Sequence, residues 1–194
     1  MSKGLAILSL MFLCSCAFTD VNIQREYYSK STEKSRSNTR VYVHVDNKED
    51  RVVGVKKNGY GIDTAQVYLP TSQSRWLKDA IESELRIQGF IVSKFRKQSD
   101  VVLDVKINQL FVEPDVGFWA ASLIGIADLN VRAKIKKGHE YERNFVEVER
   151  STEMVWTDTD IKERFNGAVS MCLSDIAVRL RELLRSKNTK VAKR

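Results

Sequence analysis

The sequence has little proline, cysteine or histidine. Its 194 residues include two Pro, three Cys and two His, together with nine Gly. So little Pro and Gly argues against a low-complexity or linker-dominated chain. Two of the three cysteines, Cys14 and Cys16, lie within the first 16 residues, which excludes a disulfide framework. Cys172 has no Cys or His at the ligand spacing of a metal site.

The residues needed for catalysis are equally scarce. His44 falls on an expected strand face and His139 beside an expected turn, so both are expected to be solvated. No Gly-rich phosphate loop, HExxH motif or paired-Cys motif occurs. Cys172 and Trp76 fall on apolar helical stripes and are expected in the core. We therefore predict a protein that is not an enzyme, with no cofactor and no metal.

The length and composition favour one domain. Apolar side chains make up 43% of the chain, enough for one sizeable core. The net charge is +7. This basic balance could favour phosphate-bearing partners, although a solubilising surface is the simpler interpretation.

The N-terminus has the pattern of a signal peptide. Lys3 precedes the nine-residue apolar stretch Leu5–Leu13. Nine residues cannot span a hydrocarbon layer of about 30 Å as a permanent helix. The residues that follow, Leu13-Cys14-Ser15-Cys16, resemble the bacterial lipobox, in which a small residue precedes the modified cysteine.

The lipobox resemblance implies a lipid anchor. A diacylglycerol thioether would form on Cys16, residues 1–15 would be removed, and the new amine would be acylated. Several acyl chains hold far more firmly than one. Ala17 stands where Asp would resemble an inner-membrane retention signal, so the resemblance points to the outer membrane, with the domain in the periplasm. The alternatives are an ordinary secretory signal and the use of Cys14.

The mature chain divides into three parts. Residues 16–40 are rich in Ser, Thr, Asn, Lys and Arg and are expected to form a flexible tether after the lipidated cysteine. Residues 41–185 are expected to form the periplasmic domain. Residues 186–194 are a basic tail.

Hydrophobic periodicity predicts the elements of the domain. Alternating apolar residues indicate strands, and apolar stripes at helical spacing indicate two helices. A loop is expected over 58–71, and Lys137–Gly138 is a turn signal between two antiparallel strands. The main expected strands cover 41–46, 101–108, 129–136 and 143–150. Residues 52–57 are expected to continue the first strand or to pair with it, and residues 90–92 to form a short strand after the first helix. The expected helices cover 72–89 and 161–185.

This order predicts an α+β domain in which two helices pack on one face of an antiparallel sheet of about four strands. The helix end Leu85–Val92, the strand Val101–Leu110, the later hairpin and the long last helix resemble the YajG-type family of small bacterial lipoproteins. The resemblance covers roughly residues 41 to 185. It implies a location in the cell envelope and no enzymatic activity, and it supplies no catalytic residues.

Residues 111–128 form the unusual segment. Pro114 is expected to interrupt a strand, and an apolar run with two aromatic rings follows it. If this run projects from the sheet, it is an exposed contact patch; if it begins the next strand, its large residues are core. The candidate interface residues are Phe118, Trp119, Leu123 and Ile124. The candidate contacts with an anionic surface are Lys187, Lys190, Lys193 and Arg194.

Two functions follow from the sequence. The first is a membrane-anchored binding subunit of a cell-envelope assembly, which contacts an envelope protein or a second copy of itself through the sheet edge or the 111–128 segment. The second is an accessory lipoprotein for lipid or lipopolysaccharide transport, which predicts binding that weakens with salt. Nucleic acid is not expected as a partner of an exported protein.

Overall fold

The structure is a computed structural model. It describes residues 19–24, 27, 29, 37–117, 121–136, 138–152 and 156–191, without the side chains of His139 and residues 186–191. In chain order the elements are β1 (Val21–Asn22), β2 (Arg40–Val45), β3 (Val52–Lys57), β4 (Asp63–Tyr68), α2 (Gln73–Ile87), β5 (Ile91–Val92), the 3₁₀ helix η2 (Arg96–Gln98), β6 (Val101–Val116), β7 (Ala121–Ile135), β8 (His139–Thr152) and α3 (Asp158–Val191).

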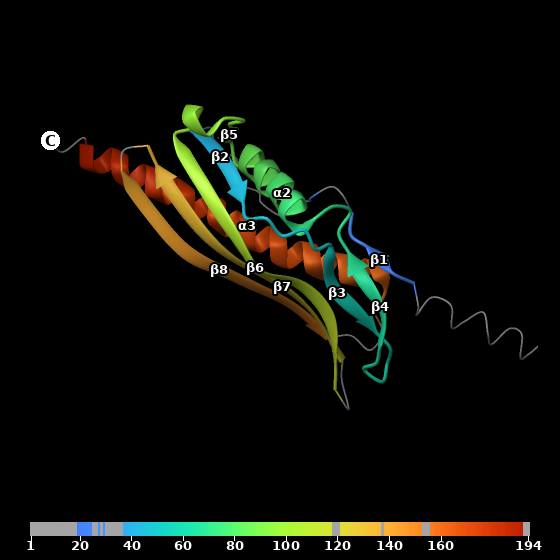
Figure 1. Cartoon of the computed structure of the whole chain (residues 1–194). Coiled ribbons are helices and arrows are strands. Elements are labelled where there is room, and N and C mark those ends of the chain that lie inside the picture. The colour runs from blue at the N-terminus through green and yellow to red at the C-terminus, as the bar shows by residue number, and fades with distance from the viewer. Residues whose placement is uncertain are drawn as a thin grey trace, which may run out of the picture.

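The fold is an open sheet with the two helices on one face, and the class α+β is confirmed (Figure 1). The prediction of about four antiparallel strands was wrong. The described residues form eight strands in one mixed sheet. β6 is central: it pairs with β7 on one side, and with β2 and β3 on the other. The pairs β2–β6 and β3–β6 are parallel, whereas β6–β7 and β7–β8 are antiparallel.

Two short strands at one side of the sheet, β1 at the edge and β4 next to it, account for part of the difference. β4 lies inside the expected loop 58–71 and pairs antiparallel with β3. Only Val67 of β4 is buried, so the segment carries little apolar alternation. β1 pairs with β4, and Val21 and Ile23 are buried. Part of the expected tether 16–40 therefore belongs to the domain.

The helices begin and end largely where the sequence predicts. α2 follows Ser72, although the Ser72 side chain makes no capping hydrogen bond. Gly89 ends α2 with φ of 86°, the left-handed conformation that glycine tolerates best. α3 begins with a capping box: Thr157 N donates to Asp160 Oδ2, and Asp160 N donates to Thr157 Oγ1.

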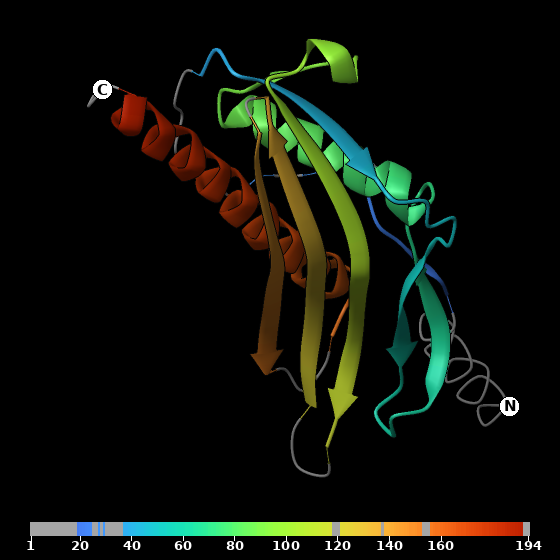
Figure 2. The ribbon, with the colours of Figure 1, turned by 60° about the vertical axis from the view of Figure 1, so that its left-hand side comes forward.

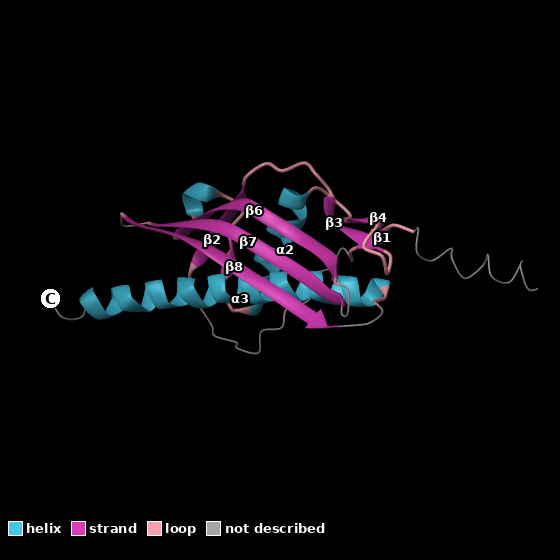
Figure 3. Ribbon diagram, turned by 90° about the horizontal axis from the view of Figure 1, so that it is seen from below, coloured by secondary structure: helices cyan, strands magenta, loops and turns pink. Residues whose placement is uncertain are grey.

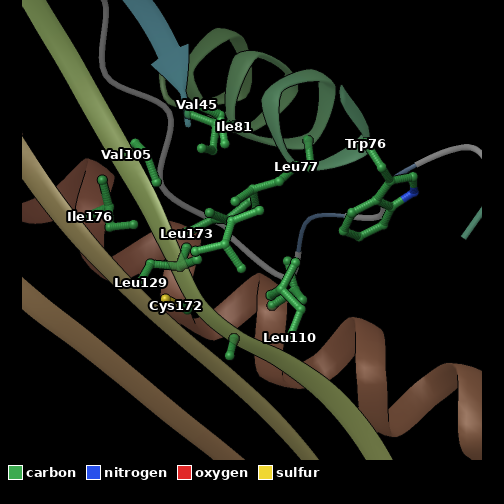
Figure 4. Packing of buried hydrophobic residues seen from close by; sticks show 14 of the residues in the cluster. Val45, Trp76, Leu77, Ile81, Val105, Leu110, Leu129, Cys172, Leu173 and Ile176 are labelled. Atoms are coloured by element: carbon green, nitrogen blue, oxygen red, sulfur yellow. The ribbon is translucent and has the colours of Figure 1, made fainter. Parts of the chain in front are cut away.

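The core lies between the sheet and the helices. Side chains from α2 (Leu77), β6 (Val105) and α3 (Leu173) meet there (Figure 4). The rings of Trp76 and Phe165 join α2 to α3, with centroids 5.4 Å apart. Trp76 and Cys172 are buried, as predicted, and so is Leu77. Burial raises the pKa of the Cys172 thiol, which keeps it protonated.

Close backbone approach fixes α3 against the sheet. A Cβ on Gly125 would lie 2.4 Å from the carbonyl oxygen of Arg164, so no larger residue fits between β7 and α3 there. α3 therefore crosses one face of β7 and β8 in direct contact (Figure 3). No described helix is apolar and long enough to cross a membrane.

Candidate functional site: the uncovered face of the sheet

A β-bulge decides which side chains of β6 face away from the helices. The β6–β7 register shifts between Ile107 and Gln109. Before the bulge the buried residues of β6 are odd-numbered, as in Val105; after it they are even-numbered, as in Val112. Phe111 consequently lies on the uncovered face. β7 keeps one alternation throughout, so Leu123 is buried and Ile124 is not.

The expected 111–128 segment is two paired strand ends. β6 runs through Pro114 to Val116, and β7 starts at Ala121. The prediction that Pro114 interrupts the strand was wrong. β3 pairs with β6 only at Val112, so β6 has no ladder on that side at Pro114 that would require an N–H donor.

The site residues predicted from the sequence lie in different parts of the structure. Leu123 is fully buried under α3, so the prediction that it belongs to the interface was wrong. It is a core residue, because it falls on the covered side of β7. Ile124 lies on the uncovered face and is partly exposed. Lys187 and Lys190 lie in the last turns of α3, where only the backbone is described. The residues Cys16, Phe118, Trp119, Lys193 and Arg194 lie outside the described residues.

An apolar row crosses the uncovered face on three strands. Phe111 is opposite Ile126, and Ile126 is opposite Val148. Ile124 and Val146 lie in the neighbouring rows. Val146 and Val148 are each 53% exposed, on the edge strand β8. Apolar side chains are costly to leave in water, so this row is a candidate contact surface.

Polar pairs border the row toward the start of β6. Arg132 is paired with Glu142 at 2.8 Å, and Lys134 with Asp104 at 3.3 Å. The Arg132 guanidinium lowers the pKa of the Glu142 carboxyl. The Asn130 amide donates to Asn144 Oδ1 at 2.7 Å. These groups partner one another along the strands, as in the polar rim of an interface.

The opposite border is also charged. Lys57 reaches Glu113 at 2.7 Å, and Arg150 lies 3.9 Å from Asp115. Along the direction of the strands, ion pairs therefore lie on both sides of the apolar row. Sequence reasoning identified the 111–128 segment but missed Val146 and Val148, whose alternation with charged residues in β8 was the available signal.

A shallow hollow of about 570 Å³ lies over the polar part of this face. Its lining includes His44 of β2, Lys106 and Asn108 of β6, and Arg132 of β7. His44 is exposed, and its Nε2 lies 3.9 Å from Asp46 Oδ1. Among the described residues no three His, Cys, Asp or Glu side chains are grouped so as to hold a metal ion.

Comparison with known families assigns the chain. Residues 28–178 match the model of a family described as uncharacterized lipoprotein. The chain belongs to this family. Membership of this family supports the prediction from the N-terminal residues that the protein is a lipoprotein. It therefore also supports a membrane-anchored protein of the cell envelope. No match is found among curated proteins.

Several solved structures are similar to this chain, and one of them, from Xanthomonas campestris, shares its fold. The protein XCC0632 from Xanthomonas campestris is 10% identical, with a TM-score of 0.63 over 88% of this chain and 99% of that one. A minor lipoprotein from Acinetobacter baumannii is 6% identical, with a TM-score of 0.40 over 79% and 96%. Lipoprotein GNA1162 from Neisseria meningitidis is 10% identical, with a TM-score of 0.34 over 74% and 99%.

Proposed function

We propose that this lipoprotein is a YajG-type, non-enzymatic binding subunit of a cell-envelope assembly, anchored by acyl chains on Cys16 in the outer membrane and facing the periplasm. The observation that carries the proposal is the apolar row Phe111–Ile126–Val148 on the uncovered face of the sheet. The partner is an envelope protein that covers this row.

The arrangement of the face favours a protein partner. A protein interface typically has an apolar centre and a polar rim, and the row has this form. Its bordering charges, such as Arg132 and Glu142, are paired within the sheet. Such pairs offer little free positive charge to lipopolysaccharide phosphates. The Phe111 ring is also an aromatic side chain of the kind enriched in protein interfaces.

Photo-crosslinking in cells tests the proposed contact. A photoreactive residue replaces Val148 in the full-length protein, and the matched control carries it at Val178 of α3, which is an exposed valine of the helical layer. We expect one dominant protein adduct from position 148 and none from 178. Lipid or lipopolysaccharide adducts would favour the transport function instead, and equal adducts from both positions would contradict the proposal.

A charge substitution tests the same face independently. Val148→Asp places a carboxylate in the apolar row without disturbing the core, since Val148 is on the solvent side of an edge strand. We expect loss of the adduct formed by a probe at Ile126, with unchanged thermal stability. Val178→Asp is the control and should leave the adduct intact.

The anchor itself requires a separate test. Cys16→Ser should abolish incorporation of an alkyne-tagged fatty acid, whereas Cys14→Ser should retain it, because only Ser15 before Cys16 fits the lipobox. Incorporation that persists in Cys16→Ser and disappears in Cys14→Ser would place the lipid on Cys14.

A further inference from the structure

The turn between β3 and β4 presents two apolar side chains to solvent. Tyr60 is 91% exposed and Ile62 is 62% exposed. Neither contributes to the core, and neither lies on the uncovered sheet face described above. Exposed apolar side chains that adjoin one another on a protruding turn are the kind of feature that marks a contact.

The turn is held in one shape. The Asn58 side-chain oxygen accepts hydrogen bonds from the backbone N–H groups of Tyr60 and Ile62. The Asn58 N–H donates to the Ile62 carbonyl, and the Gly61 N–H donates to the Asn58 carbonyl. Gly61 has φ of 78°, which glycine adopts at little cost. The two side chains are therefore displayed by an ordered turn.

The N-terminal end of the described chain leads toward this turn. β1 runs parallel to β4, with Val21 opposite Val67. Asp20 accepts a hydrogen bond from the Gln66 N–H at 3.0 Å. Since β4 begins directly after the turn and β1 runs parallel to it, Asp20 lies at the end of β1 that is nearer the turn.

The length of chain between Asp20 and the anchor is short. Cys16 precedes Asp20 by four residues, which span at most about 14 Å when extended. Ile62 precedes Gln66 by four residues as well, a distance of roughly 13 Å along a strand. Acyl chains on Cys16 would therefore hold the membrane surface within reach of the turn.

We infer that the β3–β4 turn docks into the membrane interface through Tyr60 and Ile62, and so fixes how the domain stands on the bilayer. The inference rests on the proposed acylation of Cys16. Tyrosine suits this position, because its ring prefers the level of the lipid headgroups. The neighbouring Lys57 is paired with Glu113, so burial of apolar surface supplies the attraction.

A fluorescent label distinguishes docking from simple tethering. The full-length lipidated protein is placed in vesicles of phosphatidylethanolamine and phosphatidylglycerol. A polarity-sensitive fluorophore is attached to Ile62→Cys or, as the matched control, to Phe95→Cys. Both native side chains are 62% exposed. Cys172 is buried with a raised pKa and will not react.

The two labelled positions lie at opposite ends of the domain. Phe95 precedes η2 and the start of β6, whereas a Cβ on Gly61 of the turn would lie 3.8 Å from Val116 Cβ near the end of β6 (Figure 2). The sixteen residues of β6 separate the ends by roughly 50 Å. A domain that stands on the turn cannot bring both labels to the same bilayer.

We expect a blue shift and quenching by spin-labelled lipid at position 62, and neither at position 95. A label at Tyr60→Cys should behave like the label at 62. Equal behaviour of the labels at 62 and 95 in protein that floats with the vesicles would overturn docking while leaving the anchor intact. Protein that does not float with the vesicles and carries no acyl mass would instead overturn the proposed anchor.

Discussion

The two faces of the sheet differ in what covers them. On one face, alternate residues of β2, β6 and β7, together with Phe145 of β8, are buried beneath α2 and α3. On the other face, the same strands carry paired charges and the apolar row of Phe111, Ile126 and Val148. The covered face supplies the folding energy, since burial of apolar surface is the dominant favourable term. The other face is available for contact with a partner, so substitutions on the two faces should differ in their effect on stability.

The largest contrast is expected between two adjacent residues of β7. Leu123→Ala should lower the free energy of unfolding by about 2–5 kcal/mol, because it leaves a cavity beneath α3. Ile124→Ala, on the uncovered face, should cost about 1 kcal/mol or less. Urea unfolding of both variants measures the difference. Equal losses would mean that the uncovered face is also part of the core.

A second contrast concerns the polar contacts that Tyr27 makes with the two helices on the covered side of the sheet. The Tyr27 hydroxyl donates to Glu84 Oε2 of α2 at 3.0 Å and lies 3.3 Å from Ser170 Oγ of α3. Burial, together with the Glu84 carboxylate, raises the pKa of Tyr27, so the donor keeps its proton. Tyr27→Phe removes a donor from the buried Glu84 and should cost roughly 1–3 kcal/mol in urea unfolding.

The matched control is Tyr68→Phe. The Tyr68 hydroxyl donates to Gln66 at an exposed position, and its loss should cost little. If both tyrosine variants unfold at the urea concentration of the wild type, the segment around Tyr27 does not contribute to the closure of the helical layer.

Sequence periodicity predicted the covered face better than the uncovered one. The alternation of Val41, Val43 and Val45 predicted β2, and the apolar stripe through Trp76 and Leu77 predicted α2. These positions follow strict alternation or helical spacing because burial selects for them. The short strands β1 and β4 were missed, since a short strand with few buried residues carries little of that signal.

The candidate site could be predicted only in part. The 111–128 segment was identified from its apolar run, but which residues face outward depends on the bulge beside Ile107. A bulge shifts the alternation by one residue. Its local mark is the pair of adjacent polar residues Asn108 and Gln109, which by itself does not distinguish a bulge from the end of a strand. The partners of Phe111 across the strands, Ile126 and Val148, follow from the register, which becomes visible only with the fold.

A smaller effect is expected at the start of α3, where the covering layer begins. Thr157→Ala removes the side-chain half of the capping box and should cost about 1 kcal/mol. Thr159→Ala changes the same residue type two positions later and leaves both capping bonds in place, so it should cost less. Thermal unfolding at neutral pH compares them. If Thr159→Ala is the more destabilising variant, the box does not hold the helix start.

The smallest expected effect on stability comes from two glutamates of β8, whose pKa values shift in opposite directions on the two faces of the strand. Glu147 of β8 faces α3, and burial, with Asp175 beside it, raises the pKa of its carboxyl. Glu142 of β8 lies on the uncovered face, and its hydrogen bond to Arg132 lowers the pKa of its carboxyl. The folded protein therefore binds a proton more readily than the unfolded chain at Glu147, and less readily at Glu142.

These opposite shifts fix the pH dependence of each variant. Glu147 destabilises the fold at neutral pH, and the penalty is relieved as pH falls through its raised pKa toward the ordinary value near 4.3. Glu142 stabilises the fold above that ordinary value, and its contribution is lost as pH falls toward its lowered pKa. Glu147→Gln should therefore raise the midpoint of thermal unfolding at pH 7, and Glu142→Gln should lower it slightly. As pH falls below the ordinary value near 4.3, both differences from wild type should shrink. A stabilising Glu142→Gln would mean that the ion pairs of the uncovered face, unlike its apolar row, are a cost to folding that only a bound partner could offset.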